Sequence, residues 1–252
     1  MGKNKLVGSQ TVISTRPVAN GRCGKLVVCE SLEDQTVDMS KNAANSMIKN
    51  IVFDFGQVLV HFDPSYMVGR YISEPNDAKL LEQVVFDRLY WDCLDAGTIS
   101  DEKVIEACKQ RLPERLWSAV STIYYHWIYN IPEIEGMAAL VRRIREIPNV
   151  RLFVLSNISL YLAEHADEIP ILSLFDECVF SSVCGKVKPN REIFEYLCTK
   201  YNMLPCETVF VDDNASNIKG AQDYGIIGYL FDGDVAHLDS YLQYVLKNNA
   251  ST

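Results

Sequence analysis

Aromatic residues are missing from the first part of this 252-residue chain: residues 1–50 contain no Phe, Tyr or Trp, and Phe53 is the first aromatic residue. A segment without aromatic side chains buries little apolar surface per residue, so it has little to offset the entropy lost on ordering. We therefore expect residues 1–46 to form a flexible N-terminal extension.

Long apolar runs and paired cysteines are also missing. No run approaches the roughly 20 residues needed to span a bilayer, and the N-terminus lacks the continuous apolar stretch of a signal peptide. The eight cysteines show neither a C-x-x-C pair nor the spacing of a zinc finger. We therefore expect a cytoplasmic protein with reduced thiols and no membrane partner.

Basic residues are too few to balance the acids. The chain has 24 Lys and Arg against 33 Asp and Glu, a net charge of −9. A surface of this sign repels nucleic acid, so nucleic acid is not an expected partner. The length allows one large domain or a core domain that carries a smaller one, as a monomer or a homodimer.

The other segments are organised around residues 51–60, IVFDFGQVLV. Three apolar residues precede Asp54, and Gly56 and a second β-branched run follow it. This pattern indicates a buried strand that delivers Asp54 to a tight loop at its C-terminal end. Ligands of open parallel sheets bind outside the carboxyl ends of the strands, so we interpret Asp54 as a reactive group. A cap of the next helix is the structural alternative.

Four more strand-like segments follow, separated by helical stretches. They span residues 150–155, 177–180, 208–211 and 226–230, and two of them end in Ser156-Asn157 and Asp212-Asp213. Strands that alternate with helices predict right-handed βαβ units, a parallel sheet and the α/β class. The adjacent acids repel each other unless a cation lies between them. With Lys188 in a Gly-Lys-Val-Lys-Pro loop, these strand ends indicate a phosphate site.

Residues 64–130 change to a helical period. Apolar residues between 116 and 128 form one wide stripe on a long helix, and residues 81–94 supply another helix. Ser100 is placed as the N-cap of a helix between them. We predict a small helical bundle whose core contains the three tryptophans, Trp91, Trp117 and Trp127, with a direct role in substrate binding as the alternative.

Four short motifs follow one another in the order of the predicted strands. They are Phe53-Asp54-Phe55-Gly56, Leu155-Ser156-Asn157, Lys188-Pro189, and Val211-Asp212-Asp213 followed by Asn217. In this order they resemble the motifs of the haloacid dehalogenase superfamily, and the match covers residues 50–232. The resemblance implies a Rossmann-like core of residues 47–63 and 133–252. It also implies a helical-bundle cap of residues 64–132, inserted after the first strand.

The resemblance implies a phosphoryl transfer. Asp54 would attack phosphorus to give an aspartyl-phosphate, and Lys188 would stabilise the nucleophile and the growing charge. Ser156 and neighbouring backbone amides would hold the phosphoryl oxygens, so the implied catalytic residues are Asp54, Ser156 and Lys188. The implied substrate-binding residues are Gly56, Ser156, Asn157 and Lys188.

The resemblance also implies Mg²⁺ as the cofactor. Asp54, the carbonyl of Gly56 and Asp213 would hold the ion, with Asp212 in support. Hard cations of this kind prefer carboxylate, carbonyl and water oxygens. In this role the metal would neutralise phosphate charge and orient the attack.

One position departs from the family pattern. The family usually has a general acid and base, a second Asp, two residues after the nucleophile, and here that position is Gly56. Such a group is worth about 10²–10⁴ in rate. A branch that resembles α-glucose-1-phosphate phosphatase also has Gly there, and an anomeric oxygen leaves easily. Asp63, His61 and Gln57 are other candidates to relay a proton, each with a plain structural role as the alternative.

We therefore expect a cytoplasmic Mg²⁺-dependent phosphatase of a small phosphorylated metabolite, a sugar phosphate first of all. A catalytically weak or inactive phosphate-binding or regulatory protein is the alternative from another class. A phosphomutase is disfavoured because its proton shuttle would also need the missing Asp. A dehalogenase is disfavoured because the dehalogenases of the superfamily do not keep the Asp212-Asp213 pair.

Overall fold

A parallel sheet lies at the centre of the fold. The computed structural model describes residues 47–129 and 131–247, so the predicted extension 1–46 lies outside the described residues. Five strands pair in the order β3-β2-β1-β4-β5. They are β1 (Asn50–Phe53), β2 (Arg151–Ser156), β3 (Glu177–Phe180), β4 (Thr208–Asp212) and β5 (Ile227–Leu230). The predicted α/β class with a Rossmann-like parallel sheet is confirmed.

The central strand β1 is in register with both of its neighbours, so the three strands end close together. Phe53 pairs with Val154 of β2 and with Val211 of β4. The amide of Asp54 continues the ladder with a 2.8 Å hydrogen bond to the carbonyl of Val211. The chain therefore leaves β1, β2 and β4 at one edge of the sheet, where Asp54 and Asp212 come together.

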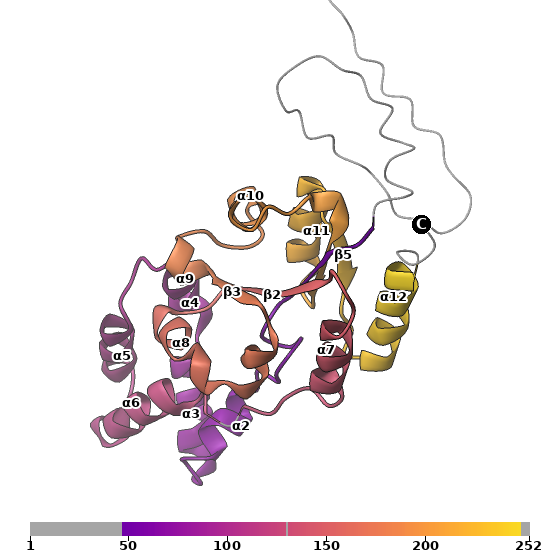
Figure 1. Ribbon diagram of the computed structural model, residues 1–252. Coiled ribbons are helices and arrows are strands. Elements are labelled where there is room, and N and C mark those ends of the chain that lie inside the picture. The colour runs from indigo at the N-terminus through magenta and orange to yellow at the C-terminus, as the bar shows by residue number, and fades with distance from the viewer. Residues whose placement is uncertain (1–46, 130, 248–252) are drawn as a thin grey trace, which may run out of the picture.

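Helices cover both faces of the sheet, so every residue of β1 is buried. Ile51 and Phe53 belong to one apolar cluster and Val52 to the other, as the two-residue period of a strand requires. In Figure 1, α7 (Met137–Arg145) and α12 (Val235–Lys247) lie together on one face. The other face carries α10 (Arg191–Lys200) and α11 (Ala215–Tyr224).

Short helical segments complete this part of the fold. The α-helical segments are α8 (Leu160–Glu164) and α9 (Ser181–Cys184), and the 3-10 segments are η3 (Ala166–Glu168), η4 (Pro170–Leu174) and η5 (Pro205–Glu207). No helix of the described residues is long and apolar enough to cross a bilayer.

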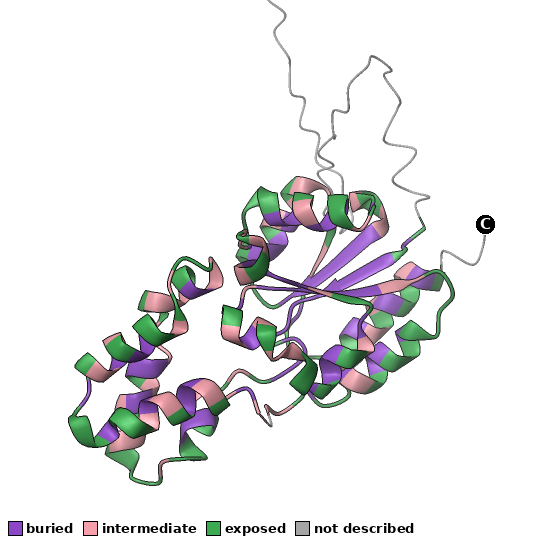
Figure 2. Cartoon of the chain, turned by 60° about the vertical axis from the view of Figure 1, so that its left-hand side comes forward, coloured by how far each residue is buried: buried purple, intermediate pink, exposed green. Residues whose placement is uncertain are grey.

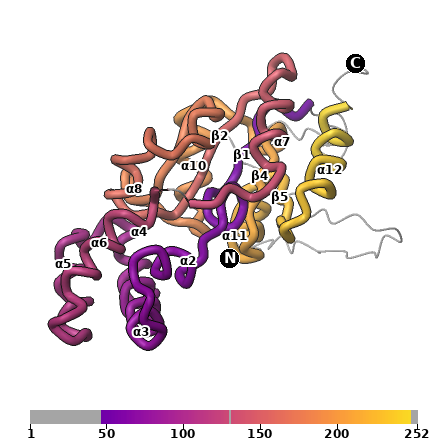
Figure 3. Tube along the Cα trace, turned by 90° about the horizontal axis from the view of Figure 1, so that it is seen from below, coloured from indigo at the N-terminus to yellow at the C-terminus, as the bar shows by residue number. Residues whose placement is uncertain are grey.

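The chain between β1 and α7 forms a second, helical body. It contains α2 (Pro64–Gly69), α3 (Pro75–Val85), α4 (Arg88–Asp95), α5 (Asp101–Gln110), η2 (Glu114–Leu116) and α6 (Trp117–His126). These helices share an apolar cluster of their own, built from residues between 68 and 124. Figures 2 and 3 show them as a separate lobe at the opposite end of the molecule from α12. This arrangement supports our division into a cap of residues 64–132 and a core, which stays a proposal.

Two details of the predicted helical bundle are wrong. Residues 81–94 do not form one helix, because Asp87 adopts an extended conformation and its carboxylate accepts the amide of Leu89, which starts α4. The tryptophans also lie outside the buried cluster of the bundle. Trp117 is 41% exposed. Trp91 and Trp127 are half-buried beside Phe62, with ring centroids 5.2 and 5.5 Å from its ring.

Candidate active site

A cavity of about 640 Å³ lies between the carboxyl ends of the strands and α4 of the cap. Six of the predicted site residues line it: Asp54, Gly56, Ser156, Asn157, Lys188 and Asp213. Asp212, the seventh, lies behind Lys188 and is fully buried. The tertiary structure therefore brings all the predicted site residues to one place, although they come from four separate segments.

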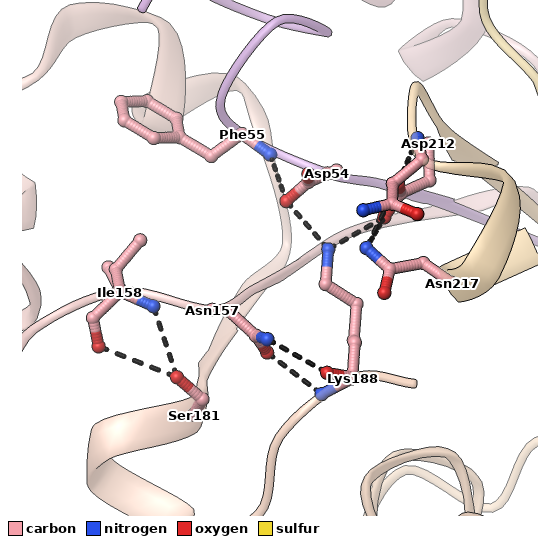
Figure 4. Close-up of polar contacts among 9 residues, drawn as sticks. Asp54, Phe55, Asn157, Ile158, Ser181, Lys188, Asp212 and Asn217 are labelled. Carbon is pink, nitrogen blue, oxygen red and sulfur yellow. Dashed lines mark hydrogen bonds and ion pairs between the residues drawn. The ribbon is translucent and has the colours of Figure 1, made fainter. Parts of the chain in front are cut away.

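Lys188 lies at the centre of the site (Figure 4). Its ammonium is 2.8 Å from Oδ1 of Asp54 and 2.7 Å from Oδ2 of Asp212, and only 4% of the residue is exposed. The ring of Phe210 lies 5.3 Å below the ammonium. Burial disfavours the charged form, but the two carboxylates outweigh it and raise the pKa of Lys188. Lys188 therefore carries a positive charge between two acids.

The loops around Lys188 are tied together by side chains of other strand ends. The side-chain amide of Asn157 makes two hydrogen bonds to the backbone of Lys188 (Figure 4). Its Nδ2 donates to the carbonyl of Lys188 at 3.0 Å, and its Oδ1 accepts the backbone N–H of Lys188 at 2.9 Å. The hydroxyl of Ser181 accepts the amide of Ile158 at 3.0 Å. The side chain of Asn157 therefore positions Lys188, and substrate binding by Asn157 stays a prediction for its backbone amide.

Besides Lys188, two residues hold Asp212 in place. It accepts the backbone amide of Asn214 at 2.8 Å, and the side-chain amide of Asn217 lies 3.1 Å from both of its oxygens. Burial raises its pKa, although the ammonium of Lys188 opposes the shift. These contacts orient Asp212 and leave Asp213, which is exposed and lines the cavity, as the more accessible acid.

The three carboxylates suit a metal ion. Asp54, Asp212 and Asp213 each offer an oxygen, and these oxygens lie within 4.8 Å of one another. Partial desolvation and the charge of Asp54 raise the pKa of Asp213, and one ammonium does not balance three acids. A hard divalent cation would relieve this repulsion, and Mg²⁺ prefers such oxygen ligands. The carbonyl of Gly56 as a further ligand stays a prediction.

The loop after Asp54 does not need glycine at position 56. The residue of this turn with positive φ is Gln57, at 58°. The turn closes through a 2.8 Å hydrogen bond from the amide of Gln57 to the carbonyl of Val60. A Cβ atom on Gly56 would meet no atom within 4 Å. The local backbone therefore has room for the acid that the family pattern places there.

The three other candidates for the missing proton relay have structural roles or lie apart. Asp63 caps α2 by accepting the amides of Ser65 and Tyr66. The side-chain amide of Gln57 donates a 3.2 Å hydrogen bond to the backbone carbonyl of Phe62. In the described part of the chain, neither Asp63 nor the exposed His61 lines the cavity. For Asp63 the structural alternative is therefore the better interpretation, whereas Gln57 lines the cavity and a proton relay by Gln57 stays a prediction.

One wall of the cavity was missed by the sequence reasoning. Four residues of α4 line it, and they recur at the spacing i, i+3, i+4 and i+7: Arg88, Trp91, Asp92 and Asp95. This helical period was visible in the sequence as a signal. The sequence alone predicts one helix over residues 81–94 and does not place this helix face against the site.

The sequence matches a model of a known protein family. The model for haloacid dehalogenase-like hydrolases matches residues 48–225. The chain belongs to this family. A D-ribitol-5-phosphate phosphatase of Bacteroides thetaiotaomicron is 26% identical over 71% of this chain and 89% of its own length. A sesquiterpene phosphatase of Aspergillus oryzae is 24% identical over 71% of this chain and 88% of its own length.

Solved structures of the family share the fold. A HAD-like hydrolase of Porphyromonas gingivalis is 25% identical, with a TM-score of 0.57 over 79% of this chain and 99% of its own. A family enzyme of B. thetaiotaomicron, solved with magnesium and inorganic phosphate, is 20% identical, with a TM-score of 0.58 over 76% of this chain and 98% of its own. The predicted family and the predicted class of enzyme, a phosphatase, are confirmed. The branch of α-glucose-1-phosphate phosphatases stays a prediction.

Proposed function

We propose that this phosphatase hydrolyses a small sugar or polyol phosphate through an aspartyl-phosphate on Asp54. The observation that carries the proposal is the buried ammonium of Lys188 between Asp54 and Asp212 at the floor of the cavity. An acid held against a cation and open to a cavity is arranged for nucleophilic attack. The same cluster provides the oxygen ligands for Mg²⁺.

Each residue of the site has a distinct role in the proposed reaction. Asp54 attacks phosphorus, and the bond between phosphorus and the oxygen of the leaving alcohol breaks. Ser156 donates its hydroxyl to a phosphoryl oxygen, and Lys188 stabilises the charge that develops on the phosphoryl group. Asp213 and Asp54 would hold the metal, with Asp212 in support. Mg²⁺ bound there would neutralise phosphate charge and orient the phosphoryl group for in-line attack.

The walls of the cavity favour a hydroxylated substrate. Its volume of about 640 Å³ is that of a site for a small metabolite. Phe62, Trp91 and Trp127 contribute an apolar wall for a carbon chain, while Arg88 and Asp92 offer polar partners for hydroxyls. The relative that is named a D-ribitol-5-phosphate phosphatase supports the same class of substrate.

The cellular compartment, the absence of a nucleic-acid partner and the oligomeric state are also part of the proposal. The six cysteines in the described residues are free thiols, which suits the reducing cytoplasm. The acidic surface argues against nucleic acid as a partner. Both a monomer and a homodimer are compatible with a site built from a single chain.

Phosphate release from a panel of sugar, polyol, aryl and isoprenoid phosphates, with and without Mg²⁺, tests the proposal. We expect Mg²⁺-dependent turnover that is highest on a sugar or polyol phosphate and is lost in Asp54→Asn. A preference for isoprenoid phosphates would overturn the substrate class. A folded protein that phosphate and Mg²⁺ stabilise but that releases no phosphate would instead be a binding protein.

A further inference from the structure

The wall of the cavity contributed by α4 is fixed to the core. The chain leaves α4 through Gly97, which has a φ of 66° and lies against α9. A Cβ atom on Gly97 would come within 2.9 Å of the carbonyl oxygen of Ser182. Only glycine allows this close approach in that conformation. The last turn of α4, which carries Asp95, is therefore held at a defined place above the strand ends.

Asp95 has a carboxyl oxygen without a protein partner. Its Oδ1 is buried and makes no hydrogen bond within the described residues, and the same is true of the indole nitrogen of Trp91, one turn earlier. Other acids of the cap are used structurally: Asp87 caps α4, and Asp101 accepts the hydroxyl of Tyr124. Because buried polar atoms are almost always paired, this unpaired oxygen sets Asp95 apart from the acids with a structural role, and Asp95 also lines the cavity.

We propose that Asp95 is the catalytic acid and base that is missing at position 56. The inference rests on the proposed function, because it assigns a role in the same two-step hydrolysis. In-line attack by Asp54 places the leaving oxygen on the far side of phosphorus, towards the cap. Asp95 lines the same cavity from the cap.

Each step balances with Asp95 in this role. In the first step the P–O bond to the alcohol breaks, the alcohol oxygen takes the proton of Asp95, and Asp54 becomes the aspartyl-phosphate. In the second step water attacks phosphorus and gives a proton to the Asp95 carboxylate. The bond between phosphorus and Asp54 then breaks, which releases phosphate and restores both carboxyl groups.

The surroundings of Asp95 support the role. Burial raises its pKa to about 7, and the nearby charge of Asp92 adds to the shift, whereas Lys188 and Arg88 oppose it and Asp54 adds a smaller contribution. The loop and helix that follow β2 face Asp95 with the uncharged Ser159 and Leu162. A group that is half protonated near neutral pH serves as acid in one step and as base in the next.

Asp95→Asn tests the assignment through the leaving group. The substrates are ribitol 5-phosphate, whose alkoxide needs a proton, and 4-nitrophenyl phosphate, whose phenolate leaves without one. We expect kcat on ribitol 5-phosphate to fall about 10²–10⁴-fold with little change in KM. We expect kcat/KM on the aryl phosphate, which reports the first step, to change only a few-fold. The matched control is Glu106→Gln, which removes an exposed acid of the cap outside the cavity lining and should leave the activity on both substrates unchanged.

An equal loss of activity on both substrates would overturn the proposal in favour of a substrate-binding role for Asp95. A higher KM for ribitol 5-phosphate with an unchanged kcat would do the same. The aryl activity also reports whether the variant is folded.

The wild-type protein provides a test that needs no variant. We expect the ratio of kcat/KM for ribitol 5-phosphate to that for 4-nitrophenyl phosphate to fall about tenfold per pH unit above pH 7, as Asp95 loses its proton. Ionisations shared by both reactions cancel in this ratio. A ratio that stays constant between pH 5 and 9 would contradict the role of Asp95 and leave the proposed phosphatase function intact. If the protein turned over neither substrate, both the role of Asp95 and the proposed phosphatase function would be wrong.

Discussion

The ammonium of Lys188 and the carboxylate of Asp212 form a buried ion pair with an N–O distance of 2.7 Å, and their side chains are 1% and 0% exposed. Asp54 lies on the other side of the same ammonium. The functional cluster is therefore also part of the structural core, because each charge depends on the others for its stability.

Lys188→Met removes the cation and leaves Asp54 and Asp212 without it. We expect turnover to be lost and the free energy of unfolding to fall by about 3–5 kcal/mol, because a buried charge is left uncompensated. Urea denaturation measures the loss. Lys219→Met is the matched control: its ion pair with Asp223 is exposed, so its removal should cost less than about 1 kcal/mol. Similar losses in the two variants would show that the buried pair does not stabilise the fold.

Asp213→Asn tests the metal site. Asp213 lines the cavity and contributes one of the three clustered oxygens, so its loss should raise the Mg²⁺ concentration for half-maximal activity by at least about tenfold. Activity measured against Mg²⁺ concentration gives this value. Asp223→Asn, on the exposed side of α11, should keep the wild-type requirement. An unchanged Mg²⁺ requirement in Asp213→Asn would exclude Asp213 as a ligand.

Gly56→Asp tests whether an acid at position 56 can replace Asp95. The position has no neighbour within 4 Å of an added Cβ, and its φ is not positive, so the variant should fold. In an Asp95→Asn background we expect Gly56→Asp to restore ribitol 5-phosphate hydrolysis by about tenfold or more, because it supplies a proton donor. Steady-state kcat of the double variant is compared with that of Asp95→Asn alone. A folded double variant without any gain would mean that position 56 does not face the leaving oxygen.

Asp95→Asn should also stabilise the protein at alkaline pH. The pKa of Asp95 is about 7 in the folded protein against 3.8 ordinarily, so the folded state binds more protons between these values and stability falls as pH rises through that window. Above pH 7 the full penalty applies, on the order of 2–4 kcal/mol. We expect Asp95→Asn to raise Tm at pH 8 and to have little effect at pH 4. A lower Tm at pH 8 would show that the carboxylate of Asp95 is stabilised by contacts that asparagine cannot make.

The sequence by itself determined the sheet and the reactive edge. Each of the strands β1, β2 and β4 is a short, mostly apolar run: β2 ends in Ser156, β4 ends in Asp212, and Asp54 directly follows β1. Such runs are typical of buried parallel strands. Parallel strands in common register must deliver their last residues to one edge. For this reason Asp54, Ser156 and Asp212 were predictable together, without any contact being known.

The tertiary structure alone decided what faces that edge. The break at Asp87 turns α4 into a separate helix, and the docking of its end against α9 aims Asp95 and Trp91 at a cavity whose floor is distant in the sequence. Trp91 and Trp127 therefore lie in the wall of the site and not in the core of the bundle, while Trp117 is exposed. The burial that raises the pKa of Asp95 comes from this docking, and a helical period records which residues share a face but not which surface that face will meet.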